Sequence, residues 1–193
     1  MATKKSDPYA FILAAVSNDQ ARLNLSRPFV RSLPEGLCLV ATDGHRLHVL
    51  RVVALDSRAD ISEGQQVLLV DGTIAPVTGS GQTPDVAKVI PRGPGAVTHT
   101  VETEILRQLS NCGPKITHKS KVLLEVSADR ICVVGNYFKH SKSVVYLQPR
   151  YVGDARIGLD TADVEIVTRG PLDPVIVRGA GQEGRYAAIM PFR

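Results

Sequence analysis

Tryptophan is absent from this chain of 193 residues, and aromatic residues make up only 5% of it. Hydrophobic residues reach 44% of the sequence, so the expected core consists mainly of Val, Leu, Ile and Ala. Cysteine is also scarce, because only Cys38, Cys112 and Cys132 occur and no two of them form a C-x-x-C pair. An odd and sparse set of cysteines argues against a disulfide framework and favours a reducing, cytoplasmic location.

The sequence lacks the common motifs of enzymes. It has no Walker-type glycine-rich run, and Gly179-Ala180-Gly181 precedes an expected strand rather than a helix, unlike a dinucleotide-binding loop. Asp43 and His45 lack an accompanying Gly-x-Ser-x-Gly nucleophile motif, so a small hydrolase remains only a remote alternative. His45 and His48 are expected on opposite faces of a strand, which disfavours a shared metal. We therefore expect no catalytic residue, metal ligand or cofactor.

Signals for membrane insertion or export are also missing. The first five residues are short and polar, no apolar segment of a signal peptide follows, and no apolar run is long enough to span a bilayer. We expect no membrane partner. The formal net charge of +4 mildly favours anionic partners, including nucleic acid, but the basic residues are scattered and an ordinary solvated surface explains each small cluster equally well.

Hydrophobic periodicity and turn residues predict an α+β chain whose order of elements occurs twice. A linker is predicted at residues 91–95, where two prolines and two glycines disfavour regular structure. It separates expected domains at 1–92 and 93–193. The first contains an expected helix at 8–18 and strands at 37–41, 46–54 and 66–70. The second contains an expected helix at 101–111 and strands at 121–126, 130–135, 143–148, 164–168, 175–178 and 185–190.

Two short runs carry most of the remaining information. Val40-Ala41-Thr42-Asp43-Gly44-His45-Arg46-Leu47 predicts a hairpin, because Asp-Gly supplies positive φ angles between two β-prone stretches. The chain closes on Ala188-Ile189-Met190-Pro191-Phe192-Arg193. The two runs together resemble the bacterial DNA sliding clamp, the β subunit of DNA polymerase III. The hairpin run is similar to one in the middle domain of that family, and the tail is similar to the end of its last domain.

Three further segments match the same family in the same order. Residues 15–25 resemble the first helix and following loop of the middle domain. Residues 83–91 resemble the segment that leaves the middle domain, and residues 170–175 resemble the approach to the last strands. The resemblance implies two clamp-like domains of antiparallel sheets with few short helices, matching the middle and last of the family's three domains.

The sequence departs from the family in the length of two segments. Clamp domains carry two helices on their inner face, but residues 71–82 and 158–170 are too short and too rich in glycine and proline for a normal second helix. We therefore expect the second helix of each domain to be lost or shrunk. This departure argues against a standard ring around DNA, and it does not by itself remove the family's partner-binding surface.

The resemblance implies a groove between the two domains that binds short peptide motifs of polymerases and other clients. An apolar pocket near Leu47, Val89 and Met190 would bind a leucine or phenylalanine anchor, with polar groups at its rim, although Val89 and Ile189 are equally compatible with plain core positions. The small Ala188 and the missing final apolar residue predict weaker binding than in a full clamp. The matching positions are Arg22, Leu25, Thr42, Gly44, His45, Arg46, Leu47, Pro84, Lys88, Val89, Ala188, Ile189, Met190, Pro191, Phe192 and Arg193.

The resemblance also implies sequence-independent contact with duplex DNA through phosphates. The candidate residues are Gln20, Asn24, Arg27, Arg107, Lys115, Lys119 and Lys121. Because six domains form a ring in known clamps, two-domain subunits would form a homo-oligomeric ring as trimers. The leading function is a replication or repair factor that acts as a scaffold. The alternative is a non-ring relative that recruits or sequesters clamp-binding proteins as a regulator.

Overall fold

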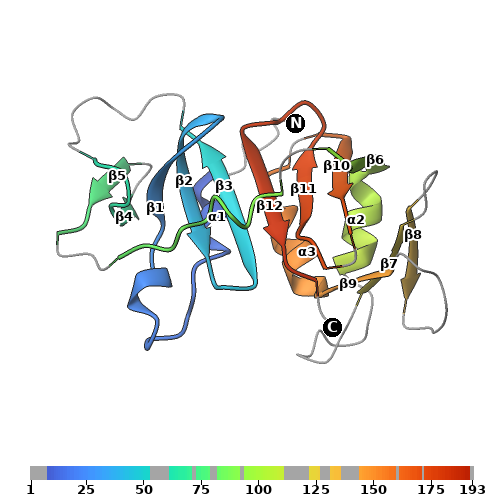
Figure 1. The fold of residues 1–193 in the computed structure, drawn as a ribbon, viewed down its shortest axis with the longest axis horizontal. Helices are drawn as coiled ribbons and strands as arrows, with labels where there is room; N and C mark the ends of the chain where they lie inside the picture. The colour runs from blue at the N-terminus through green and yellow to red at the C-terminus, as the bar shows by residue number, and fades with distance from the viewer. Residues whose placement is uncertain are drawn as a thin grey trace, which may run out of the picture.

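The computed structural model describes residues 8–52, 61–70, 73–78, 82–91, 94–110, 122–126, 131–135, 144–159, 161–170 and 172–191. Within these residues most of the regular structure is antiparallel sheet, accompanied by three α-helices and one 3-10 turn (Figure 1). The helices are α1 (Pro8–Leu13), α2 (Thr103–Ser110) and α3 (Pro149–Ala155), and the 3-10 turn is η1 (Leu23–Leu25).

The largest sheet has seven strands in the order β1-β2-β3-β12-β11-β10-β6, and every neighbouring pair is antiparallel. It joins the two halves of the sequence where β3 pairs with β12, with Leu47 opposite Ala188. Its strands are β1 (Phe29–Leu33), β2 (Gly36–Thr42), β3 (Arg46–Arg51), β6 (Val97–Glu102), β10 (Asp163–Thr168), β11 (Val175–Gly179) and β12 (Arg185–Ile189).

Two smaller sheets flank the large one (Figure 1). One pairs β4 (Val67–Val70) with β5 (Thr73–Pro76). The other has the order β8-β7-β9, built from β7 (Val122–Val126), β8 (Ile131–Gly135) and β9 (Val144–Leu147). The expected α+β fold with antiparallel sheets and few short helices is therefore confirmed.

Successive side chains of a strand point to opposite faces of a sheet. Both faces of the large sheet carry buried apolar residues, so both are covered. Leu39, Ala41, Ala187 and Ile189 belong to a core shared with the helices, and we call this side the helix face. The alternate residues belong to a second core that includes Val86 and Ile90. Val86 and Ile90 lie in residues 82–91, the crossing segment, which passes in front of β2 and β3 in Figure 1 while the helices lie behind. The crossing segment therefore covers the face opposite the helices.

Several predicted elements have different bounds or were missed. The helix predicted at 8–18 ends at Leu13, and the helix predicted at 101–111 begins at Thr103, because β6 occupies Val97–Glu102. The strand predicted at 46–54 ends at Arg51. Four short strands and helices were not predicted, namely β1, β5, β6 and helix α3, and neither was the 3-10 turn η1. Helix α3 is only seven residues long, so the second half keeps a shrunken second helix, placed before residues 158–170 rather than within them.

Candidate peptide-binding groove

The turn of the β2–β3 hairpin is held by its own side chains. Asp43 Oδ1 accepts hydrogen bonds from the backbone N–H groups of His45 and Arg46, at 2.9 and 3.1 Å. The hydroxyl of Thr42 accepts a hydrogen bond from Gly44 N–H at 3.1 Å and donates one to the carbonyl of Arg46 at 2.6 Å. Gly44 has φ +93°, which side-chain-bearing residues rarely adopt. The Thr-Asp-Gly run therefore fixes a rigid tip in which only glycine is unstrained at the third position.

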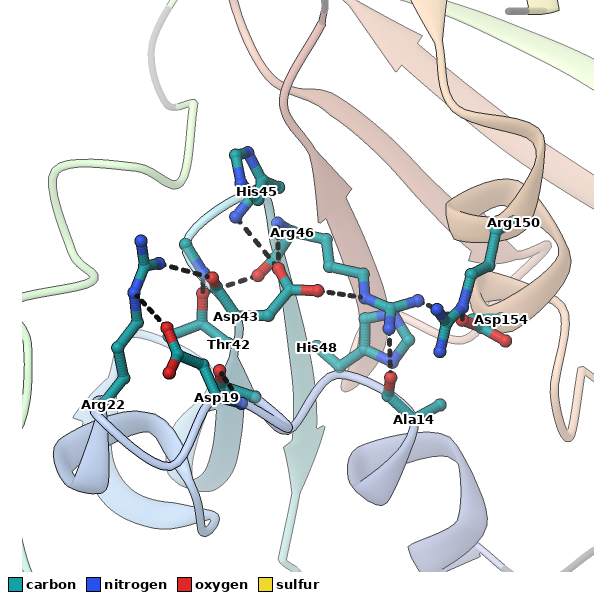
Figure 2. A network of polar contacts seen from close by, with 12 residues as sticks. Ala14, Asp19, Arg22, Thr42, Asp43, His45, Arg46, His48, Arg150 and Asp154 are labelled. Carbon is teal, nitrogen blue, oxygen red and sulfur yellow. Dashed lines mark hydrogen bonds and ion pairs between the residues drawn. The ribbon is translucent and has the colours of Figure 1, made fainter. Parts of the chain in front are cut away.

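Arg46 links this tip to the helices (Figure 2). Its side chain is 2% exposed, and it forms ion pairs with Asp43 on the hairpin and with Asp154 on α3. It also donates a hydrogen bond to the carbonyl of Ala14, and its guanidinium lies 4.6 Å from the ring centre of Tyr151. Two carboxylates and a carbonyl thus compensate a buried cation, as a buried charge requires. This network holds the hairpin against both α3 and the end of α1.

The carboxy-terminal strand forms the neighbouring wall. Strand β12 pairs with β3 along its length, and the N–H of Met190 donates to the carbonyl of His45 at 2.9 Å just beyond the strand. Ile189 is fully buried on the helix face, whereas Ala188 is buried on the opposite face. The alternation places Met190 on the same side as Leu47.

The crossing segment forms the third wall, and Arg31 on β1 holds it in place. One guanidinium nitrogen of Arg31 donates to the carbonyls of Thr83 and Pro84, at 3.1 and 3.0 Å, and to the hydroxyl of Thr83 at 3.1 Å. Glu63 lies 3.8 Å from another nitrogen of the same group. A single side chain therefore anchors the point where the crossing segment enters the sheet face.

These three walls enclose a mostly apolar pocket of about 220 Å³, the hairpin groove. Leu47 is almost fully buried beneath it, while Val89 and Met190 are half-buried at its sides. Gly44 and the small Thr42 leave the hairpin backbone open to an approaching chain. The full lining is Leu25, Thr42, Gly44, Arg46, Leu47, Pro84, Asp85, Val86, Val89 and Met190.

Half of the sixteen positions that the sequence singled out for peptide binding meet at this groove. These eight residues come from four segments of the chain: Leu25, Thr42, Gly44, Arg46, Leu47, Pro84, Val89 and Met190. Arg22 lies beside the hairpin, where it donates to the carbonyl of Asp43 at 3.3 Å. Asp85 and Val86 also line the groove, and the sequence interpretation missed them.

Other predicted positions lie outside the lining. Ala188 and Ile189 are core residues, so the core alternative holds for Ile189, while Val89 lines the groove. His45 is exposed at the turn, with its ring centre 6.4 Å from that of Tyr151. Lys88 is exposed and pairs with Asp85 at 3.6 Å, and Pro191 is half-buried beyond Met190. Phe192 and Arg193 lie outside the described residues.

Within the described part of the chain, the candidate DNA-contacting residues lie on separate elements. Gln20, Asn24 and Arg27 are exposed around η1. Arg107 is exposed on α2 and donates two hydrogen bonds to Glu104, at 2.6 and 2.5 Å, which balances much of its charge and raises its pKa. Lys115, Lys119 and Lys121 lie outside the described residues.

Two buried groups have strongly shifted pKa values without forming a reactive centre. Burial lowers the pKa of His48 to about 3, although its Nδ1 lies 2.6 Å from the carbonyl of Phe11. Burial, together with the charge of Glu35, raises the pKa of Cys38 to about 11, so this thiol stays protonated. Among the described residues no group of three potential ligands is placed to hold a metal ion. No helix within those same residues has the length and apolar character needed to cross a membrane.

Comparison with solved structures gives the fold. The chain superposes on DNA polymerase III subunit β from Borrelia burgdorferi with a TM-score of 0.71 and 14% identity, covering 96% of this chain and 60% of that one. The sliding clamp of Bacillus subtilis gives 0.67 and 18% identity, with 96% and 61% covered. The β sliding clamp of Caulobacter crescentus gives 0.70 and 18% identity, with 100% and 67% covered.

The chain therefore has the sliding-clamp fold and resembles a shortened bacterial clamp, as the sequence predicted. It spans about 60% of the length of the first two of these clamp chains. No family model and no curated protein matches the sequence.

Proposed function

We propose that this protein is a sliding-clamp-like scaffold of DNA replication or repair that binds short peptide motifs of polymerases and other client proteins. It acts by holding partners and catalyses no reaction. The observation that carries the proposal is the hairpin groove, in which the hairpin, η1, the crossing segment and the end of β12 bring eight predicted residues together.

The physical character of the groove suits a peptide with an apolar anchor. Burying a leucine or phenylalanine side chain contributes roughly 1.5–3 kcal/mol. The flexible thioether of Met190 adapts to anchors of different shape, which suits a scaffold with several clients.

A fluorescence-anisotropy titration with a labelled clamp-binding peptide tests the proposal. Val89→Asp and Met190→Asp place a carboxylate at half-buried wall positions and are expected to abolish binding while the chain stays folded. Leu47→Asp is expected to abolish binding too, but its side chain is only 2% exposed, so circular dichroism must accompany it. Leu172→Asp is the matched control, because Leu172 is 57% exposed and outside the groove. Absence of binding to the wild-type protein at millimolar peptide would refute the proposal.

The assembly state separates the two forms of this function. A ring of six clamp domains needs three copies of this chain, and DNA held in such a ring is gripped through phosphates, so the affinity falls steeply with salt. Exchanging Arg27 for Gln should then reduce the salt dependence. A monomer by native mass spectrometry at micromolar concentration, with the peptide still bound, would instead favour a non-ring relative that recruits or sequesters clamp-binding proteins.

A further inference from the structure

A second cavity lies on the same sheet face, at the other end of the crossing segment. Its volume is about 420 Å³, which falls within the range of small-ligand sites. We call it the linker cavity, because Ile90, Pro91 and Ala96 from the connection between the two halves form one side. The remaining lining residues are Glu35, Thr98, Val167, Ile176, Arg178, Glu183 and Tyr186. None of these residues belongs to the hairpin groove.

The linker cavity contains an unsatisfied carboxylate. One oxygen of Glu35 accepts a hydrogen bond from the hydroxyl of Tyr186 at 3.4 Å. The other oxygen, Oε2, is buried and has no hydrogen-bond partner among the described residues. Burying half of a carboxylate without a donor costs free energy, and this carboxylate therefore keeps spare acceptor capacity for a donor that enters the cavity.

The charges around the cavity leave this carboxylate uncompensated. Glu183 adds a second negative charge at the exposed rim. Arg178 is the cation in the lining, and its Nε donates to Glu165 at 2.6 Å, so its charge is already matched. Arg51 lies near the turn that carries Glu35, but within the described part of the chain it forms no ion pair with Glu35 or Glu183. The cavity is therefore complementary to a cation.

The walls narrow the choice of cation. Tyr186 is 4% exposed, and it lies among the apolar side chains of Ile90, Val167 and Ile176. A guanidinium is planar and less strongly hydrated than an ammonium group, so it can lie against apolar side chains while donating several hydrogen bonds. We propose that the linker cavity binds the guanidinium of an arginine side chain presented by a protein partner, with the Glu35 carboxylate as its main acceptor and Glu183 at the rim.

The two cavities are close enough for one partner to occupy both. Val89 lines the hairpin groove and Ile90 lines the linker cavity, so consecutive residues, about 3.8 Å apart at Cα, separate them. A peptide that passes over the crossing segment needs about three extended residues, which span roughly 10 Å. This identification of the partner rests on the proposed function, whereas guanidinium binding itself does not.

The direct test uses N-acetyl-arginine amide as the probe and methyl NMR as the readout. We expect the probe to shift the methyl resonances of Ile90 and Ile176 and to leave that of Met190 unchanged. The neutral isostere N-acetyl-citrulline amide should bind about tenfold more weakly, because it lacks the charge. Glu35→Gln should weaken binding of the arginine probe about fivefold or more, and Glu183→Gln, on an exposed turn, should weaken it less. Equal binding of both probes, or no shift at tens of millimolar, would overturn the proposal.

A peptide pair then tests the shared partner. The first peptide carries an apolar clamp-binding motif, and the second adds three glycines and an arginine, placed at either end in separate versions. We expect one version to bind about fivefold more tightly than the motif alone, and Glu35→Gln to remove that gain. If the motif peptide binds and neither arginine version binds more tightly, the claim that one partner occupies both cavities is wrong. The proposed function would still stand. Binding of the arginine probe with no binding of the motif would refute the proposed function instead.

Discussion

Arg46 on strand β3 and Asp154 on helix α3 are 108 positions apart in the sequence and form an ion pair in the interior. The pair joins the first half of the chain to the second at the base of the hairpin groove. Arg150, one turn earlier on α3, lies 3.7 Å from the same carboxylate, so Asp154 receives two cations. The shape of the groove therefore depends on a charge network that neither half can complete alone.

Breaking this pair should destabilise the protein and loosen the groove together. Asp154→Asn removes one of the two carboxylates that compensate Arg46, whose side chain is 2% exposed, and we expect a loss of about 1–2 kcal/mol in the free energy of unfolding. Arg46→Met removes the cation altogether and leaves Asp43 and Asp154 facing each other, so the expected loss is larger, about 2–4 kcal/mol. Urea unfolding measures both values.

The matched control is an ion pair of the same type on the surface. Lys88 and Asp85 lie 3.6 Å apart, with side chains that are 86% and 60% exposed, so Lys88→Gln should change the stability by no more than about 0.5 kcal/mol. If Asp154→Asn were as harmless as Lys88→Gln, the network would not hold the two halves together. A double-mutant cycle on Arg46 and Asp154 would show the coupling directly.

Gly44 is the second point at which groove and backbone are linked. Alanine at φ +93° is strained, and its Cβ would also lie 3.3 Å from the guanidinium of Arg22, so Gly44→Ala should cost about 1–2 kcal/mol and weaken peptide binding about tenfold. Gly181→Ala provides the comparison, because Gly181 has φ +74° with open space around it and lies away from the groove. Comparable destabilisation in both variants, with affinity lost in Gly44→Ala alone, is the expected result of paired urea and binding measurements. Equal affinities would show that the tip of the hairpin does not contact the peptide.

The hairpin could be predicted from the sequence because its signals are local. Asp43 and Gly44 supply both the side-chain acceptor and the positive φ of the turn, and the flanking residues are β-prone. The pairing of β3 with β12 is not local, and it entered only through the resemblance to clamps. The local sequence of residues 46–51 and 185–189 does not predict that these two strands pair.

The elements that were missed depend on tertiary packing. Helix α3 begins with Pro149 at its first turn, a known start signal, but it is short and contains Gly153, so its local propensity is poor. Burial of Val152 and Ala155 against the helix face stabilises it. Likewise, β6 is an exposed strand of alternating Val, Thr and His, and it is ordered by pairing with β10. Asp85 and Val86 lie in a segment that resembles clamps, but their place in the groove follows from the path of the crossing segment.

Arg31 should control affinity for the peptide more than stability. Arg31→Lys keeps the charge, but its shorter side chain ends before the position of the guanidinium nitrogen that donates to Thr83 and Pro84, so the crossing segment is held less firmly at the groove wall. We expect the dissociation constant of the peptide to rise about three- to tenfold, with a small change in stability. The same exchange at the exposed Arg27 should leave the affinity for peptide unchanged, and an identical response at both positions would show that Arg31 does not shape the groove.

His48 should make the fold sensitive to acid. Its side chain is fully buried against Phe11, with ring centres 4.3 Å apart, and Nδ1–H donates to the carbonyl of Phe11. Its Nε2 is buried and has no partner among the described residues, so a proton there would lack an acceptor. Burial therefore lowers the pKa from 6.5 to about 3, and the unfolded chain binds the proton first as the pH falls.

The stability that His48 confers is thus complete above pH 6.5 and is lost on acidification toward about pH 3. The slope is about 1.4 kcal/mol per pH unit, so urea unfolding at pH 5.0 should show about 2 kcal/mol less stability from this group than at pH 7.5. His48→Gln retains a donor for Phe11 and should flatten this slope, whatever its stability at pH 7.5. His45→Gln, at the exposed turn, should leave the slope as it is. A slope that persists unchanged in His48→Gln would assign the acid sensitivity to other groups and would contradict a neutral, desolvated imidazole at this position.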